Sequence, residues 1–270
     1  MSGLVRHPAV AGRFYPDDAA VLSAEVRSYL APQQERIAAI GCIAPHAGYM
    51  YSGHVAGAVY SRSRVPLRCI VLCPNHTGRG KPLSIMSEGW WETPLGNITI
   101  DANLASALKQ RFPALAEDAE AHRAEHAVEV QLPFLQVCRE DAKFVPIALG
   151  TGRFEILQAL GEAVGEVLED SAERVLLIAS SDMNHYENGA ITRVKDQKAI
   201  ERILALDPAG LFEVVMREQI SMCGFGPAVV MLTAARKLGA SRAELVKYAT
   251  SADVSGDSER VVGYAGMLVA

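Results

Sequence analysis

The stretch Cys69-Ile70-Val71-Leu72-Cys73-Pro74-Asn75-His76 joins a short apolar run to a turn that carries a histidine. A continuous apolar run of this length, bounded by turn residues, is typical of a strand that is buried on both faces of a sheet. Five further runs of this kind occur along the chain, at residues 37–44, 144–149, 175–179, 245–249 and 261–269. We therefore expect six buried strands, and run 261–269 is apolar enough to lie at or near the centre of the sheet.

Segments with helical periodicity alternate with these runs. They are residues 17–30, 53–61, 102–111, 125–139, 154–169, 192–204, 208–218 and 227–238. The alternation predicts an α/β fold of three layers, in which a mainly parallel, twisted sheet is flanked by helices. Residues 83–100 depart from it, because residues 90–100 indicate two β segments around a Pro/Gly turn, so we expect an inserted β-hairpin there. No Pro-, Gly- or Ser-rich linker or repeat divides the sequence, and residues 1–270 are predicted to form a single domain.

The composition excludes several classes of protein. Half of the residues are hydrophobic and 21% are charged, which is typical of a globular protein with a large core. The net charge is −5, and the scattered Lys and Arg residues form no run that would follow a nucleic acid backbone. No apolar stretch reaches the roughly 18 residues that cross a bilayer, and the first residues lack the features of a secretory signal. We expect no nucleic acid or membrane partner, and a cytoplasmic location.

The cysteine pattern predicts reduced thiols. The five cysteines include no Cys-x-x-Cys pair, and four of them, Cys42, Cys69, Cys73 and Cys138, lie in apolar surroundings. Cys223 differs, because it precedes Gly224-Phe225-Gly226 and Pro227, which is expected as the first residue of the next helix. The positive end of that helix favours the thiolate, which binds metals or attacks electrophiles. A buried thiol beside a glycine-rich turn is the alternative.

Three histidines follow predicted strands. His46, His76 and His185 each lie a few residues after the end of an apolar run. In α/β proteins, ligands bind beyond the carboxyl ends of the strands. A single histidine in this position is more often a hydrogen-bonded structural imidazole, but three at one edge favour a shared site. Neutral imidazoles bind Fe, Zn, Cu or Ni and do not choose among them.

Two more residues are candidates for proton transfer. Asp182 lies three residues before His185 and either orients that imidazole, faces a substrate or braces the loop. His126 is expected near the start of helix 125–139, where histidines are more often surface or capping residues. His7, His54 and His122 have no comparable setting, and we expect them to be structural or solvated.

Two common catalytic motifs are absent from the sequence. It contains neither a phosphate-binding loop of the G-x-x-x-x-G-K type nor a G-x-S-x-G elbow. Nucleotide hydrolysis and serine esterase chemistry are therefore not expected.

Taken together, these segments resemble the Memo family, whose bacterial members include protein B of the AmmeMemoRadiSam system. The matching segments are residues 6–16, Ala44-Pro45-His46-Ala47-Gly48-Tyr49, 51–53, Cys73-Pro74-Asn75-His76, Glu125-His126, 131–133, Ser180-Ser181-Asp182, His185-Tyr186, Cys223-Gly224, Thr250-Ser251 and 261–264. Each piece is short, but their number and order along nearly the whole chain make the resemblance specific.

The resemblance implies a relation to the class III extradiol dioxygenases, which cleave catechol rings with Fe(II) held by two histidines and a carboxylate. It implies that His46 and His76 are the metal histidines and that Cys223 occupies the third ligand position. His126 and His185 would handle substrate protons and bound oxygen. A thiolate in place of a carboxylate makes a softer site that suits Fe(II), Zn(II) or Cu(I).

The leading hypothesis is a cytosolic metal-binding protein, and more narrowly a dioxygenase-like, metal-dependent oxidoreductase with Fe(II) as the first choice of metal and Cu or Zn as alternatives. His185, assisted by Asp182 and His126, would act as acid and base on a small-molecule or peptide substrate. The alternative is a non-catalytic scaffold that retains the ancestral pocket of the family and uses it to bind a peptide or a partner protein. Family-level association suggests radical SAM and Amme-domain proteins as partners. A cysteine hydrolase that uses Cys223 and His185 is a third hypothesis.

Overall fold

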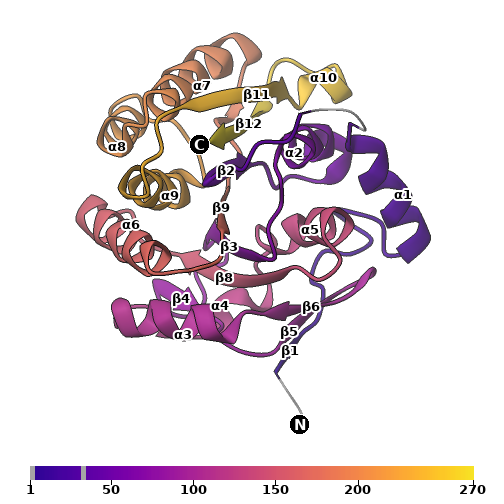
Figure 1. The fold of residues 1–270 in the computed structure, drawn as a ribbon. Helices are drawn as coiled ribbons and strands as arrows, with labels where there is room; N and C mark the ends of the chain where they lie inside the picture. Colours follow the sequence, from indigo (N-terminus) through magenta and orange to yellow (C-terminus); the bar gives the residue numbers. More distant parts are fainter. Residues whose placement is uncertain (1–3, 32–34) are drawn as a thin grey trace.

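A computed structural model describes residues 4–31 and 35–270, and the strands within these ranges form one twisted sheet of twelve strands between two layers of helices (Figure 1). The strands are β1 (Val5–Arg6), β2 (Gly41–Ala44), β3 (Arg68–Pro74), β4 (Leu83–Ile85), β5 (Trp90–Thr93), β6 (Gly96–Ile100), β7 (Ala116–Glu117), β8 (Lys143–Leu149), β9 (Val175–Ser180), β10 (His185–Glu187), β11 (Ala243–Thr250) and β12 (Val261–Val269). The main path through the sheet is β1-β5-β6-β8-β3-β9-β2-β12-β10.

The centre of the sheet is parallel, as predicted. Strands β8, β3, β9 and β2 all run in the same direction, and Cys69 of β3 pairs with Phe144 on one side and Leu176 on the other. Their side chains are almost all buried, because helices cover both faces. The carboxyl ends of these strands therefore meet at one edge.

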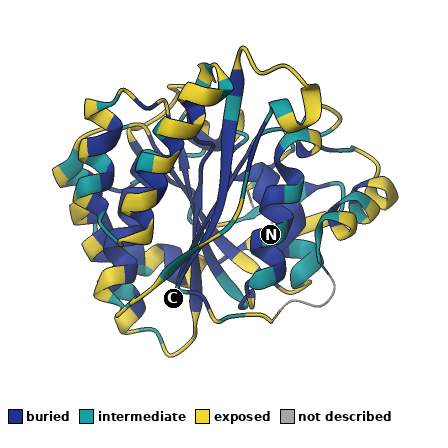
Figure 2. Ribbon diagram, turned by 90° about the horizontal axis from the view of Figure 1, so that it is seen from above, coloured by how far each residue is buried: buried dark blue, intermediate teal, exposed yellow. Residues whose placement is uncertain are grey.

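Helices on the two faces enclose two separate apolar cores. On one face lie α1 (Ala19–Tyr29), α2 (Tyr49–Arg62) and α5 (Leu132–Cys138), and on the other lie α3 (Ala102–Arg111), α6 (Phe154–Glu169), α7 (Gly189–Leu204), α8 (Pro208–Arg217) and α9 (Phe225–Lys237). Two short helices, α4 (Glu120–Arg123) and α10 (Ala252–Ser255), lie in connecting segments. Figure 2 shows the buried side of each long helix turned toward the sheet. The three-layer α/β prediction is confirmed.

The predicted insertion is a hairpin, but a shorter one than residues 83–100. Strands β5 and β6 pair antiparallel across a two-residue turn, with Trp90 opposite Thr99. Strand β4 is separate from this hairpin and pairs with β8 and β7. The hairpin extends the main sheet because β6 also pairs with the start of β8.

Strand β12 lies inside the sheet, but toward one end of it. It runs antiparallel to β2 and, further along, to β10 on one side, and antiparallel to β11 on the other. Its apolar sequence reflects this two-sided pairing, although the parallel centre lies at β3 and β9. The remaining predicted strands and most helices are found within four residues of the predicted boundaries.

Two predicted helix starts are wrong. Residues 125–128 are not helical, and a 3-10 turn (Glu129–Gln131) precedes α5. The reason is local, because the Glu125 carboxylate accepts the backbone N–H of Ala127 and competes with a helical turn. Helix α9 begins at Phe225 rather than Pro227, with Gly224 as its N-cap, since a proline in the first turn needs no N–H partner.

Within the described ranges, no helix is both long and apolar enough to cross a bilayer.

Candidate metal centre

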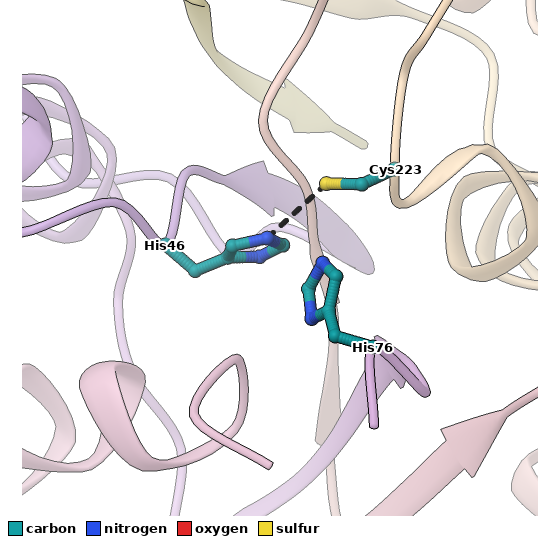
Figure 3. A group of neighbouring side chains, drawn as sticks. All are labelled: His46, His76 and Cys223. Carbon is teal, nitrogen blue, oxygen red and sulfur yellow. Dashed lines mark hydrogen bonds between the residues drawn. The ribbon is translucent and has the colours of Figure 1, made fainter. Parts of the chain in front are cut away.

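The edge where the parallel strands end brings three predicted ligands together (Figure 3). His46 follows β2, His76 follows β3, and Cys223 lies in the loop before α9. One ligand atom of each lies within 4.8 Å of those of the other two. His46 Nε2 is 3.1 Å from Cys223 Sγ, and the rings of His46 and His76 are 5.1 Å apart. Residues separated by up to 177 positions in sequence thus share one small volume.

A buried network fixes the tautomer of His46. Ser180 Oγ lies 3.0 Å from His46 Nδ1 and donates its only hydrogen to the carbonyl oxygen of Ala127, at 2.6 Å. The hydroxyl also accepts a hydrogen bond from Gln131 Nε2. Since the hydroxyl hydrogen is already used, His46 Nδ1 must carry the proton and donate to Ser180. Nε2 therefore presents a lone pair toward Cys223.

A buried carboxylate performs the same task for His76. Glu125 is fully buried, and its Oε1 lies 2.9 Å from His76 Nδ1 while Oε2 accepts the backbone N–H of His76 at 2.6 Å. Burial would raise the pKa of Glu125, but the bonds from His76 and Ala127 lower it to about 2. An ionised carboxylate only accepts, so His76 Nδ1 is protonated and Nε2 is free to coordinate.

Burial favours the neutral form of two imidazoles, those of His46 and His126. Desolvation, followed by the nearby His76, lowers the pKa of His46 to about 3. Desolvation and the neighbouring His46 lower the pKa of His126 to about 4. Neutral imidazoles are the form that binds metal ions.

The environment of Cys223 corrects one expectation from the sequence. Burial, together with the nearby Asp182 carboxylate, raises the pKa of the Cys223 thiol well above its usual range. The start of α9, two residues earlier than predicted, lies close to Cys223 but does not outweigh desolvation, so the metal-free protein holds a protonated thiol. Gly224 is required beside it, because a Cβ there would lie 2.5 Å from the backbone oxygen of Ser180.

The other predicted site residues border the same place. The ring of His126 stacks on that of His76 at 4.8 Å and packs against Phe14 at 4.8 Å. Asp182 is buried and accepts the backbone N–H of His46 at 2.8 Å, so it braces the His46 loop. His185 is held through Nδ1, which donates to the backbone oxygen of Ser221 at 2.8 Å, so its Nε2 is unprotonated when the ring is neutral.

A cavity of about 320 Å³ joins these groups. Its lining residues are Phe14, His46, Ala47, Gly48, His76, His126, Asp182, His185, Tyr186, Val262 and Tyr264. Four of these residues are histidines, and most of the others are aromatic or aliphatic. This volume is at the lower end of the range found for small-molecule sites.

The structure does not pair Cys223 with His185, as the cysteine hydrolase hypothesis requires. Cys223 Sγ lies against His46, and no hydrogen bond between Cys223 and His185 exists in the described part of the chain. A protonated, desolvated thiol is also a poor nucleophile.

Sequence reasoning missed three residues of the site. Glu125, Ser180 and Gln131 orient the two histidines but lie far from them in sequence. The pairs Glu125-His126 and Ser180-Ser181 were visible beside candidate residues, which was the only signal. Of the histidines set aside, His122 is fully buried against Trp91 and so structural, whereas His7 is exposed and paired with Glu92.

Comparison with known proteins gives a consistent result. The family model described as "Memo-like protein" matches residues 6–268. A MEMO1 family protein of Methanopyrus kandleri is 43% identical over 97% of this chain and 98% of its own length. MEMO1 family proteins of Pyrobaculum aerophilum and Methanosarcina mazei are 42% and 43% identical, each over 98% of this chain.

Proposed function

The chain belongs to the Memo family, and from that premise we propose that His46, His76 and Cys223 bind a transition metal as the centre of a metal-dependent oxidoreductase. The observation that carries the proposal is the common orientation of the histidines. Both are pinned through a protonated Nδ1 to a buried acceptor, which leaves two Nε2 lone pairs and one sulfur facing a shared point.

The geometry of the donors supports this assignment. Nitrogen and sulfur ligands about 2.1 Å and 2.3 Å from a tetrahedral metal lie about 3.6 Å from each other. The 3.1 Å between His46 Nε2 and Cys223 Sγ needs only a small outward shift to match. His46 and His76 also line the cavity, so a metal held by these three residues would be within reach of a small ligand there, as catalytic sites require.

The donor set suits Fe(II) first, with Cu(I) and Zn(II) as alternatives, because imidazole and thiolate bind all three. When bound, such a metal supplies Lewis acidity and, for iron or copper, electrons for oxygen chemistry. Coordination requires the thiolate, so Cys223 must release its proton when the site is loaded.

The remaining residues support proton transfer beside this site. His185 presents an Nε2 lone pair to the cavity and is the proposed base. His126 is neutral and stacked on His76, where it can hold or release a proton at a bound ligand. Asp182 contributes by fixing the backbone of His46 and facing the same cavity.

Metal analysis tests the proposal. Wild type, His76→Ala and Cys223→Ala are purified anaerobically, reconstituted with Fe(II), Zn(II) or Cu(I), and analysed for metal content. We expect near-stoichiometric metal in the wild type and little in either variant. His7→Ala and Cys138→Ala are matched controls outside the site and should keep the wild-type content.

A wild type that retains no near-stoichiometric metal would contradict the proposal. That outcome would favour the alternative of a non-catalytic scaffold for a peptide or partner protein, for which His46→Ala changes nothing. Oxygen uptake with a panel of catechols then tests the dioxygenase-like chemistry separately. Radical SAM and Amme-domain partners stay a prediction.

A further inference from the structure

Tyr264 differs from the other buried tyrosines in the fate of its hydroxyl. Tyr15 donates to Glu129 Oε1 at 2.6 Å, Tyr49 to the backbone oxygen of Val130 at 2.7 Å, and Tyr60 to Gln131 Oε1 at 2.9 Å. Tyr264 is only 2% exposed, yet its hydroxyl has no hydrogen-bond partner among residues 4–31 and 35–270. The hydroxyl is not sealed from solvent, because Tyr264 lines the cavity, so water can pair with it there and a ligand that enters can take the place of that water.

The strand directs Tyr264 into the candidate site. Val262 and Tyr264 are two positions apart on β12, so they share one face of the strand, and both line the cavity with His46 and His185. Two backbone bonds hold the strand here, from Met183 N–H to the oxygen of Gly263 and from Gly263 N–H to the oxygen of Asn184. The side chain is therefore positioned by the fold and does not lie on a loose loop.

The charge of the cavity limits what this hydroxyl can meet. Among the described residues, those that line the cavity include no Lys or Arg, and Asp182 is their only carboxylate. Burial and the nearby Asp182 raise the pKa of Tyr264, so the hydroxyl keeps its proton at neutral pH and can donate it. In metal-free protein, a ligand with a full negative charge would meet no lysine or arginine among these lining residues, whereas an uncharged oxygen can accept a hydrogen bond from Tyr264.

We propose that Tyr264 is a specificity-determining residue, whose hydroxyl donates a hydrogen bond to the carbonyl or hydroxyl oxygen of a small, uncharged ligand in the cavity. The proposal rests on the proposed function in locating the ligand beside His46 and His76. It is nevertheless tested in metal-free protein, so that its failure can be told apart from failure of metal binding.

The test uses two probes of nearly the same shape, acetophenone and α-methylstyrene, of which only the first has an acceptor oxygen. Their affinities for chelator-treated wild type and Tyr264→Phe are measured by NMR titration. We expect the wild type to bind the ketone about five- to tenfold more tightly than the alkene, as one hydrogen bond provides. In Tyr264→Phe the ketone should lose this advantage while the alkene binds as before.

Controls separate a lost hydrogen bond from a damaged fold. Tyr51→Phe removes a hydroxyl from a tyrosine outside the cavity lining and should keep the wild-type preference for the ketone. The thermal midpoint and metal content of Tyr264→Phe should equal those of the wild type. The proposal is overturned if neither probe binds, if shift changes map away from His46 and His185, or if Tyr264→Phe still prefers the ketone.

Discussion

The cavity has two unlike walls. The strand-end wall consists of His46, His76 and His126, and the first two are anchored on the buried side chains of Ser180 and Glu125. The β10 wall consists of His185, Tyr186, Val262 and Tyr264. Its histidine is anchored on a backbone oxygen, and Tyr186 is 66% exposed with a φ of 63°, a strained value for a tyrosine.

This difference separates two tasks. Ser180 and Glu125 are buried and hydrogen-bonded, so they fix the orientation of the two histidine rings. High affinity for a metal requires this fixed orientation. A half-exposed strand with a register irregularity between His185 and Glu187 can adjust to a ligand. We therefore expect substitutions in the strand-end wall to change metal binding, and those in the β10 wall to change ligand handling.

The largest expected effect contrasts one histidine from each wall. His46→Ala should abolish near-stoichiometric metal binding, because it removes one of the three proposed ligands. His185→Ala should keep the metal and lower any turnover found in the catechol panel by about 10²- to 10⁴-fold, since it removes the proposed base. Metal analysis and oxygen uptake on both variants check this, and equal metal loss in both would abolish the distinction.

A second prediction probes the anchor itself. Glu125→Gln keeps the shape of the side chain but places an NH₂ group against the N–H of His76 or Ala127. We expect an affinity for metal that is about 10- to 100-fold lower, measured by competition with a chelator. Glu120→Gln, at an exposed position of α4, is the matched control. Unchanged affinity in Glu125→Gln would show that the anchor is dispensable.

A third prediction concerns the glycine that lets the Cys223 loop approach β9. In Gly224→Ala, the new methyl group meets the backbone oxygen of Ser180 and forces the loop outward. We expect the free energy of unfolding to fall by about 2–3 kcal/mol in urea titrations, with weaker metal binding. Gly189→Ala has its nearest neighbour at 3.7 Å and should be close to neutral. Equal effects would remove the steric explanation.

The smallest expected effect concerns Asp196, which lies next to the β10 wall, and the pH dependence of stability. Asp196 accepts the backbone N–H of Asn184 and the hydroxyl of Tyr248, and burial raises its pKa to about 6. The folded state therefore holds this proton more tightly than the unfolded state. Its contribution to stability is full below the unfolded value near 4 and is lost as the pH rises through about 6.

The matching measurement is urea unfolding of wild type and Asp196→Asn at pH 4 and pH 7. Relative to the variant, the wild type should be about 2 kcal/mol more stable at pH 4 than at pH 7. A difference between the two proteins that does not vary with pH would show that Asp196 keeps an ordinary pKa.

The sequence predicted the strands well and the anchors poorly, for a physical reason. A continuous apolar run such as residues 69–73 favours a buried strand wherever it occurs. The position of His76, just after this run, at the edge of the sheet follows from that. Anchors such as Glu125 act across long sequence separations, and no local pattern distinguishes them. Glu125 also breaks the helix that periodicity predicted, because its carboxylate is used by His76 and Ala127.

Residues that complete the cavity were missed for a related reason. Tyr264 lies in an apolar strand, where an aromatic residue is expected in the core whether or not its hydroxyl is used. Its distinction is a missing partner, which only the folded arrangement reveals. Cys223 was found because of its glycine-rich surroundings and the family resemblance, but the protonation state of its thiol depends on burial.

The pairing of β12 with β2 has a consequence for biosynthesis. A nascent chain that has emerged as far as α7 already carries His46, His76 and His126 but lacks both Cys223 and β12. Until residues 261–269 follow, one edge of β2 is unpaired and must be kept from other chains. The strand that completes the sheet also carries Tyr264, so the cavity, like the last of the proposed metal ligands, Cys223, is completed only late in translation.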